Sequence, residues 1–404
     1  MEKPINRCDI FCNVIDNYGD IGVCWRLARQ LANEHGLAVR MWVDDLGSLA
    51  KLCHEADVAR DIQHCRGVEV RRWRESGNPP TFRYLRANGE EEAIQPAGLV
   101  IEAFACKLPQ SYVEAMAMQQ ESVWINLEYL SAENWVHGCH GLPSPHPGLP
   151  LTKYFFFPGF TKRTGGLLLE RDLFARRDAF QSDVVRQQAF WRSLGMGMPD
   201  AKTLKISLFG YENEALAGLF DAWANGAQPV LCLVPEGRIL PQVGGYFGDI
   251  APCAGGSYAR GNLQVRVLPF AEQERYDELL WACDVNFVRG EDSCVRAQWA
   301  GKPFVWQIYP QHDAVHWQKL QAFLDLYSAP FGTGARQAVE GLWHAWNSGG
   351  EAGDAWPTFA AARSELESRA QGWALELAEN NLALNLLDFS RKIGRMRAFE
   401  IEGQ

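Results

Sequence analysis

The amino-acid sequence predicts an α/β protein made of two Rossmann-like domains that face each other across a cleft. Two successive series of alternating strand and helix patterns and a helical C-terminal tail support this prediction. At 404 residues the chain is too long for one ordinary hydrophobic core. The predicted domains are residues 1–165 and 166–384, with a helix over about 385–404 expected to pack back on the first domain.

The first series begins with an apolar strand at residues 10–15 and continues into an amphipathic helix at 20–35. The same patterns predict further elements: strands at 38–43, 68–73, 98–103 and 122–127, and a helix at 46–56. A stretch rich in Pro, Gly and His at 138–150 predicts an exposed loop, or a surface arm that contacts a partner. The polar, glycine-rich residues 161–166 predict a hinge between the two domains.

The second half starts with a helical pattern at residues 178–194 and ends with an almost wholly helical pattern at 359–399. Between them lies the second alternating series, with strands at 204–209, 229–234, 263–267, 283–288 and 303–308 and helices at 213–224, 273–282 and 294–300. Repetition of the α/β pattern predicts that this half forms its own parallel sheet.

The composition, 47% hydrophobic and 22% charged residues, is that of a globular protein. A net charge of −10 argues against direct nucleic-acid binding, which needs a basic surface. The first ten residues include Glu2 and Asp9 instead of a signal-peptide core, and no apolar run is long enough for a membrane span. Eleven cysteines without a C-x-x-C pair fit buried, reduced thiols, so we expect a cytoplasmic protein without membrane contact.

Two carboxylates, Asp16 and Asp20, lie in the loop between the first strand and its helix. Open α/β sheets bind their ligands at such strand ends. The simpler interpretation is that Asp20 caps the helix and Asp16 caps the loop, but a cap needs only one of them. A second carboxylate would raise the basicity of the first, whereas the helix dipole would lower it, and both outcomes stay open at this point.

A second candidate site is the segment at 289–301, RGEDSCVRAQWAG, which follows an apolar strand and opens a helix. The backbone N–H groups of Asp292 and Ser293 are expected to point into the cleft, where a helix start can hold a phosphate without a metal. The Ser293 hydroxyl would add a donor, and Arg289 would add positive charge. The alternative interpretation is an ordinary capped helix.

The order of features in this region resembles the donor side of two-domain sugar transferases of the GT-B type: strand, G-E-D-S, helix, A-G-K-P, strand and then Gln311-His312-Asp313. Aromatic residues also follow strand ends in this half, namely Phe209, Tyr211 and Phe270. Such residues more often complete a hydrophobic core than bind a ligand. Three of them facing one cleft would instead sandwich a pyrimidine such as thymine.

Four motifs together, DNYGDIGVCWRLARQL, SLFGYEN, LPF and RGEDS, make the chain similar over nearly its whole length to the EarP family of bacterial elongation factor P arginine rhamnosyltransferases. The resemblance implies an inverting GT-B enzyme that requires no metal and no cofactor. Such an enzyme moves L-rhamnose from dTDP-β-L-rhamnose to one arginine of elongation factor P, which activates that factor to rescue ribosomes stalled at polyproline.

The resemblance also implies site residues by matching position. Asp20 would be the general base, Asp16 would support it, and Glu291 would be essential on the donor side. The implied donor-binding residues are Asn17, Gly19, Phe209, Tyr211, Phe270, Gln273, Glu291, Asp292 and Ser293. The acceptor protein would bind the first domain, because the donor motifs occupy the second.

The chemistry is compatible with this assignment. A guanidinium is protonated in water and is a poor nucleophile, so paired carboxylates can bind it and accept its proton. Two alternatives remain open. One is a GT-B transferase that uses a dTDP-sugar on a small-molecule or lipid acceptor. The other is a nonenzymatic nucleotide-binding module, for which Asp20→Asn would have no effect.

Overall fold

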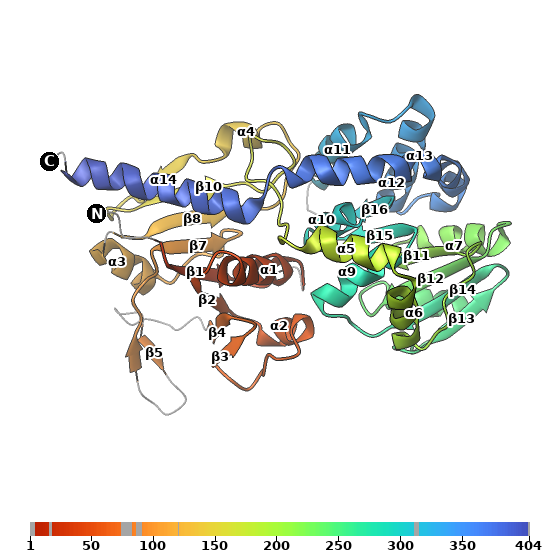
Figure 1. Ribbon diagram of the computed structural model, residues 1–404, viewed down its shortest axis with the longest axis horizontal. Coiled ribbons are helices and arrows are strands. Elements are labelled where there is room, and N and C mark those ends of the chain that lie inside the picture. The colour runs from red at the N-terminus through yellow and green to blue at the C-terminus, as the bar shows by residue number, and fades with distance from the viewer. Residues whose placement is uncertain are drawn as a thin grey trace. The chain divides into compact units, whose positions relative to one another are not determined.

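The computed structural model describes residues 5–15, 18–73, 83–85, 91–119, 121–310 and 315–402. The chain divides into two compact units, one formed by Met1–Arg171 with Leu377–Gln404 and the other by Asp172–Glu376 (Figure 1). The predicted hinge at 161–166 is wrong, because these residues lie inside the first unit. They are fixed there by Asn380, whose side-chain amide donates to the Thr161 carbonyl at 2.7 Å.

The first unit is built on an eight-stranded sheet in the order β3-β4-β2-β1-β7-β8-β10-β9. The six strands from β4 to β10 are parallel, and β3 and β9 pair antiparallel at the two edges. Across the sheet from β4 to β10, these six strands are the third, second, first, fourth, fifth and sixth parallel strands of the chain. This is the strand order of a Rossmann fold. The strands are β1 Arg7–Cys12, β2 Ala38–Val43, β3 Ile62–Cys65, β4 Val68–Arg72, β7 Leu99–Ala103, β8 Val123–Leu127, β9 Pro143–Pro145 and β10 Thr152–Phe156, with β5 Arg83–Leu85 and β6 Glu91–Ala93 as a separate pair.

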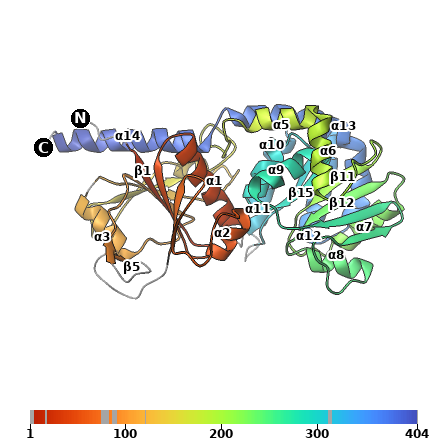
Figure 2. The ribbon, with the colours of Figure 1, turned by 60° about the horizontal axis from the view of Figure 1, so that its bottom comes forward.

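Both faces of this sheet are covered, because successive strand residues point to opposite faces. Phe11 and Trp42 stack on one face at 5.6 Å and pack with Tyr112 and Met116 of α3. Helix α1 packs against β1 and β2 on the other face, where it also contacts α14 (Figure 2). The helices of this unit are α1 Gly19–Asn33, α2 Leu46–Leu52, α3 Gln110–Gln119, α4 Val136–Cys139 and α14 Leu382–Glu402.

The second unit has a six-stranded sheet in the order β13-β14-β12-β11-β15-β16, which is parallel except for β13. Its strands are β11 Leu204–Leu208, β12 Val230–Pro235, β13 Ser257–Arg260, β14 Leu263–Leu268, β15 Val285–Arg289 and β16 Phe304–Gln307. Its helices are α5 Leu173–Ser182, α6 Val184–Ser193, α7 Leu216–Asn225, α8 Leu240–Phe247, α9 Gln273–Ala282, α10 Asp292–Trp299, α11 Val315–Ser328, α12 Thr333–Ser348 and α13 Ala352–Ala378, which continues into the first unit. Within the described ranges, no helix is long and apolar enough to cross a membrane.

The structure adds local detail to three predictions. The helix predicted at 178–194 is two helices, because Asp183 adopts an extended conformation and its carboxylate caps α6 by accepting the Val185 N–H at 2.8 Å. The loop predicted at 138–150 contains β9, which pairs with β10. The almost wholly helical pattern predicted at 359–399 is confirmed, with one break before α14, where the side chain of Asn381 donates to the Leu169 carbonyl at 2.6 Å.

Replacing Gly166 by alanine is expected to lower the free energy of unfolding by at least about 2 kcal/mol. Gly166 has a φ of +83°, and a Cβ atom there would lie 2.0 Å from the Asn380 carbonyl oxygen. Denaturant unfolding measures the change. Gly138→Ala is the control, because a Cβ at Gly138 meets nothing within 4 Å. Equal unfolding curves for both variants would contradict the close approach at Gly166.

Candidate functional site

The strand order of each sheet reverses at one point. The reversal lies between β1 and β7 in the first unit and between β11 and β15 in the second. Open α/β sheets bind ligands at the carboxyl ends of the strands at this point. Asp20 follows β1 and Glu291 follows β15, so both predicted acids lie where the topology favours a site.

Asp20 is buried in the first turn of α1, with 3% of its surface exposed. The N-cap of this helix is Tyr18, so the interpretation of Asp20 as the N-cap is wrong. Its carboxylate instead accepts the Ile15 N–H at 2.9 Å and holds the loop that leaves β1. Asp16 and Asn17 lie outside the described residues, and their predicted roles stay predictions.

The neighbouring strand ends hold this loop in place. Asp44, directly after β2, accepts the Val14 N–H at 3.0 Å. After β7, Ala105 and Lys107 adopt positive φ angles of 53° and 58°, which are unfavourable for residues with a side chain. The buried Glu102 stabilises this conformation by accepting the Lys107 N–H at 3.1 Å. Hydrogen bonds to the carboxylates of Asp20, Asp44 and Glu102 therefore hold the loops at this edge of the sheet.

In the second unit, Arg289 brings together residues from two strand ends. Its guanidinium lies 4.6 Å from the ring centre of Phe209 and 4.5 Å from that of Tyr211. Tyr276, which was not predicted from the sequence, packs against Phe209 with ring centres 5.6 Å apart. Burial raises the pKa of the Tyr276 phenol, so this phenol is neutral near pH 7. The site thus combines aromatic faces with a buried positive charge.

The start of α10 lies directly beside Arg289. The Ser293 hydroxyl donates to the Arg289 carbonyl and accepts the Arg289 N–H at 3.1 Å, so its proton is used within the chain. Asp292 accepts a hydrogen bond from the Gln273 amide at 3.3 Å. The structure therefore brings Gln273, Asp292 and Ser293 together at one helix start. The residues Gln311, His312 and Asp313 lie outside the described residues.

Glu291 precedes α10 but does not cap it with its side chain. Its carboxylate instead forms an ion pair with Lys319 of α11, with Nζ and Oε1 3.0 Å apart. Both side chains are mostly buried, at 16% and 14% exposure. Lys319 was missed by the sequence analysis, because no local motif connects it with Glu291.

Phe270 follows β14, two strands away from β11 in the sheet. It is half-buried, and its N–H donates to Glu236 at 3.3 Å. Because β14 and β11 are parallel to the same central strand, β12, Phe270 and Phe209 lie at the same edge of the sheet. The three aromatic residues therefore follow strands that end at the same edge of the sheet, and the base that they would sandwich stays a prediction.

Two buried thiols lie near the candidate residues. A hydrogen bond with Cys24 and burial raise the pKa of Cys12, and burial and the nearby Glu291 raise the pKa of Cys294. Both thiols are therefore protonated near neutral pH and are poor nucleophiles.

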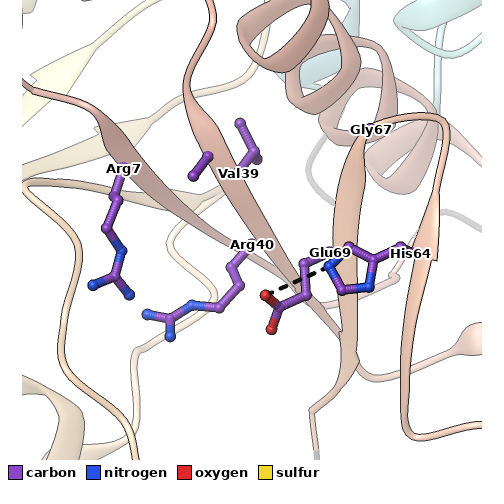
Figure 3. Close-up of a pocket in the computed structure, with 7 residues that line it drawn as sticks. Arg7, Val39, Arg40, His64, Gly67 and Glu69 are labelled. Atoms are coloured by element: carbon purple, nitrogen blue, oxygen red, sulfur yellow. Dashed lines mark ion pairs between the residues drawn. The ribbon is translucent and has the colours of Figure 1, made fainter.

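A surface pocket in the first unit lies away from these residues. It is lined by Arg7, Arg40, His64 and Glu69 at the beginnings of β1 and β2 and along β3 and β4 (Figure 3). Asp20 follows the opposite, carboxyl end of β1. The pocket is therefore not part of the candidate site.

Comparison with known proteins identifies the family. The profile of the family described as Elongation-Factor P (EF-P) rhamnosyltransferase EarP matches residues 8–391. The chain belongs to the EarP family. Protein-arginine rhamnosyltransferases of Pseudomonas putida and Pseudomonas aeruginosa are 49% and 47% identical to it, over 95% and 94% of this chain and 98% of each relative.

A solved structure concerned with EarP-mediated arginine glycosylation of translation elongation factor EF-P is also similar. It shares 36% identity and a TM-score of 0.66, with 96% of this chain and 99% of that chain covered. The chain is a glycosyltransferase with the GT-B fold, as the resemblance of its motifs implied. Membership of this enzyme family excludes the interpretation of the chain as a nonenzymatic nucleotide-binding module.

Proposed function

We propose that this EarP-family enzyme transfers L-rhamnose from dTDP-β-L-rhamnose to an arginine of elongation factor P, with inversion at the anomeric carbon and without a metal. The first unit would bind the acceptor, and the second would bind the donor. The observation that carries the donor side is the arrangement of Arg289 against Phe209 and Tyr211 beside the start of α10. Aromatic faces suit a nucleobase, and the arginine and the helix start suit a diphosphate.

On the acceptor side, Asp20 supplies a carboxylate at the strand end where ligands bind. The guanidinium nitrogen must lose a proton as it forms the bond to the anomeric carbon, because a protonated guanidinium has no available lone pair. Asp20 accepts that proton while the bond between the anomeric carbon and the phosphate oxygen breaks. The leaving dTDP gains negative charge, which the start of α10 and Arg289 stabilise.

Inversion follows from the proposed direct displacement, in which Asp20 acts as the base and not as a nucleophile. The nearby thiols are also poor nucleophiles, because a hydrogen bond with Cys24 and burial raise the pKa of Cys12, and burial raises the pKa of Cys294. Direct attack by the arginine nitrogen instead gives an α-linked rhamnosyl arginine. NMR of the product distinguishes the linkages, and a β linkage would overturn this step.

The experiment that tests the function is the intact mass of elongation factor P after incubation with the enzyme and dTDP-rhamnose in EDTA. Addition of one deoxyhexose to a single arginine is the expected result, with Asp20→Asn as the inactive control. An unmodified factor, with dTDP still bound by the enzyme, would reject this acceptor and favour a small-molecule or lipid acceptor. Product that forms only without EDTA would reject metal independence.

Phe270→Ala is expected to weaken dTDP binding about 10- to 100-fold, because stacking of a base on an aromatic ring contributes about 1–3 kcal/mol. Calorimetric titration with dTDP measures the change. Phe247→Ala is the matched control, since Phe247 is a half-buried aromatic residue of the same unit that stacks on Tyr258 at 5.0 Å. Full-strength dTDP binding by the Phe270→Ala protein would contradict the proposed base site.

A further inference from the structure

The ion pair between Lys319 and Glu291 brings a residue from a separate helix to the donor side. Lys319 lies on α11, 28 residues after Glu291 in the chain. The 3.0 Å distance between Nζ and Oε1 is that of a charge-assisted hydrogen bond. Both residues also influence the thiol of Cys294 electrostatically, in opposite directions, which locates the pair at the start of α10.

The usual role of an acid at a helix start does not account for Glu291. Such an acid commonly accepts a backbone N–H of the first turn, but Glu291 makes no capping hydrogen bond. The neighbouring positions have separate partners, because Asp292 accepts from Gln273 and Ser293 bonds to the Arg289 backbone. The Glu291 carboxylate is therefore directed by the ammonium group of α11 and not by its own helix.

A carboxylate that is 16% exposed loses much of its hydration, and a positive partner compensates for that loss. Asp292 follows Glu291 directly, so two negative charges meet beside a predicted diphosphate site. An ammonium group at 3.0 Å restricts the Glu291 side chain to one orientation. A residue that must meet a sugar or a phosphate oxygen in one position benefits from that restriction.

We propose that Lys319 is a positioning residue for Glu291, whose carboxylate it holds oriented toward the nucleotide-sugar donor. The proposal rests on the proposed function, because it takes Glu291 as a donor-side residue. It differs from a purely structural role, in which the pair only fastens α11 to α10. The two roles predict different effects of the single changes: loss of a purely structural pair lowers thermal stability and leaves kcat unchanged, whereas loss of a positioning pair lowers kcat.

The test is a double-mutant cycle with Lys319→Met, Glu291→Gln and the double variant. Each single change is expected to lower kcat about 10- to 100-fold, the equivalent of one charge-assisted hydrogen bond. The double variant is expected to be no slower than the slower single variant, because Lys319 acts through Glu291. Lys319→Arg, which keeps the charge, is expected to recover most of the activity lost in Lys319→Met.

Lys302→Met is the matched control. Lys302 forms an ion pair with Glu367 at 2.6 Å in the same unit and is similarly buried, at 18% exposure. This change is expected to leave kcat unchanged, whatever it does to thermal stability. If the fold loss of kcat in the Lys319 and Glu291 double variant equalled the product of the two single losses, the proposal would be overturned. Wild-type turnover by either single variant would overturn it as well.

The same cycle is measured in donor binding by calorimetry with dTDP-rhamnose, without acceptor. Non-additive losses of affinity would support the proposal even if elongation factor P is not the acceptor. A wild-type protein that binds the donor but does not modify the factor would reject only the proposed acceptor. A wild-type protein that does not bind the donor would reject both the donor assignment and the role of Lys319.

Discussion

Asp20→Asn is expected to lower the rate of arginine rhamnosylation by about 10²- to 10⁴-fold, the usual contribution of a general base. Asparagine has nearly the same shape, and its side-chain oxygen can still accept the Ile15 N–H that Asp20 accepts at 2.9 Å. The loop after β1 should therefore keep its conformation while the proton acceptor is lost. Single-turnover measurement by intact mass of elongation factor P gives the rate.

Asp45→Asn is the control for this change. Asp45 lies at the same edge of the same sheet, after β2, and its exposed carboxylate caps α2 through the N–H groups of Gly47 and Ser48. The substitution is expected to keep the full rate and to cost at most about 1 kcal/mol of stability. If Asp20→Asn were as fast as Asp45→Asn, with an unchanged thermal transition, Asp20 would not be the base.

The regular elements were largely predictable, because buried strands and amphipathic helices leave a periodic apolar pattern. The bounds of β2 and α9 were predicted without error. Helix α11 was missed although its buried residues Leu320, Phe323, Leu324 and Tyr327 follow helical spacing, so that signal was present in the sequence. The break at Asp183 was not visible in the same way, because a capping side chain interrupts a helix without interrupting its polarity pattern.

The residues of the candidate site also differ in how far they could be predicted from the sequence. Residues of one local motif, such as Asp292 and Ser293, were predictable because a strand followed by a helix start is a local feature. Two contacts were not predictable, because they join separate strands and helices: the stacking of Arg289 on Phe209 and the ion pair of Lys319 with Glu291. Such contacts depend on strand order and helix packing, which one sequence does not specify locally. The pairing of β11 with β15 brings Arg289 next to Phe209 and Tyr211.

Asp277→Ala is expected to lower the free energy of unfolding by about 3–5 kcal/mol, because it leaves the buried charge of Arg296 without its carboxylate. The two side chains form a bidentate pair with distances of 2.8 and 2.7 Å, and each is 1% exposed. The pair joins α9, which begins with Gln273, to α10, which begins with Asp292. Weaker dTDP binding should therefore accompany the loss of stability, and denaturant unfolding and calorimetry measure the two effects.

Two further variants separate the buried charge from the packing of the helices. Asp277→Leu combined with Arg296→Met replaces both charges by apolar groups of similar size, and it is expected to recover most of the lost stability. Asp325→Ala removes a carboxylate 3.8 Å from Arg336 at the exposed surface and is expected to leave the unfolding curve unchanged. If the double variant were as unstable as Asp277→Ala, the loss would come from packing and not from an unpaired charge. If it regained stability without regaining dTDP affinity, the ion pair itself would be needed to align the two helix starts.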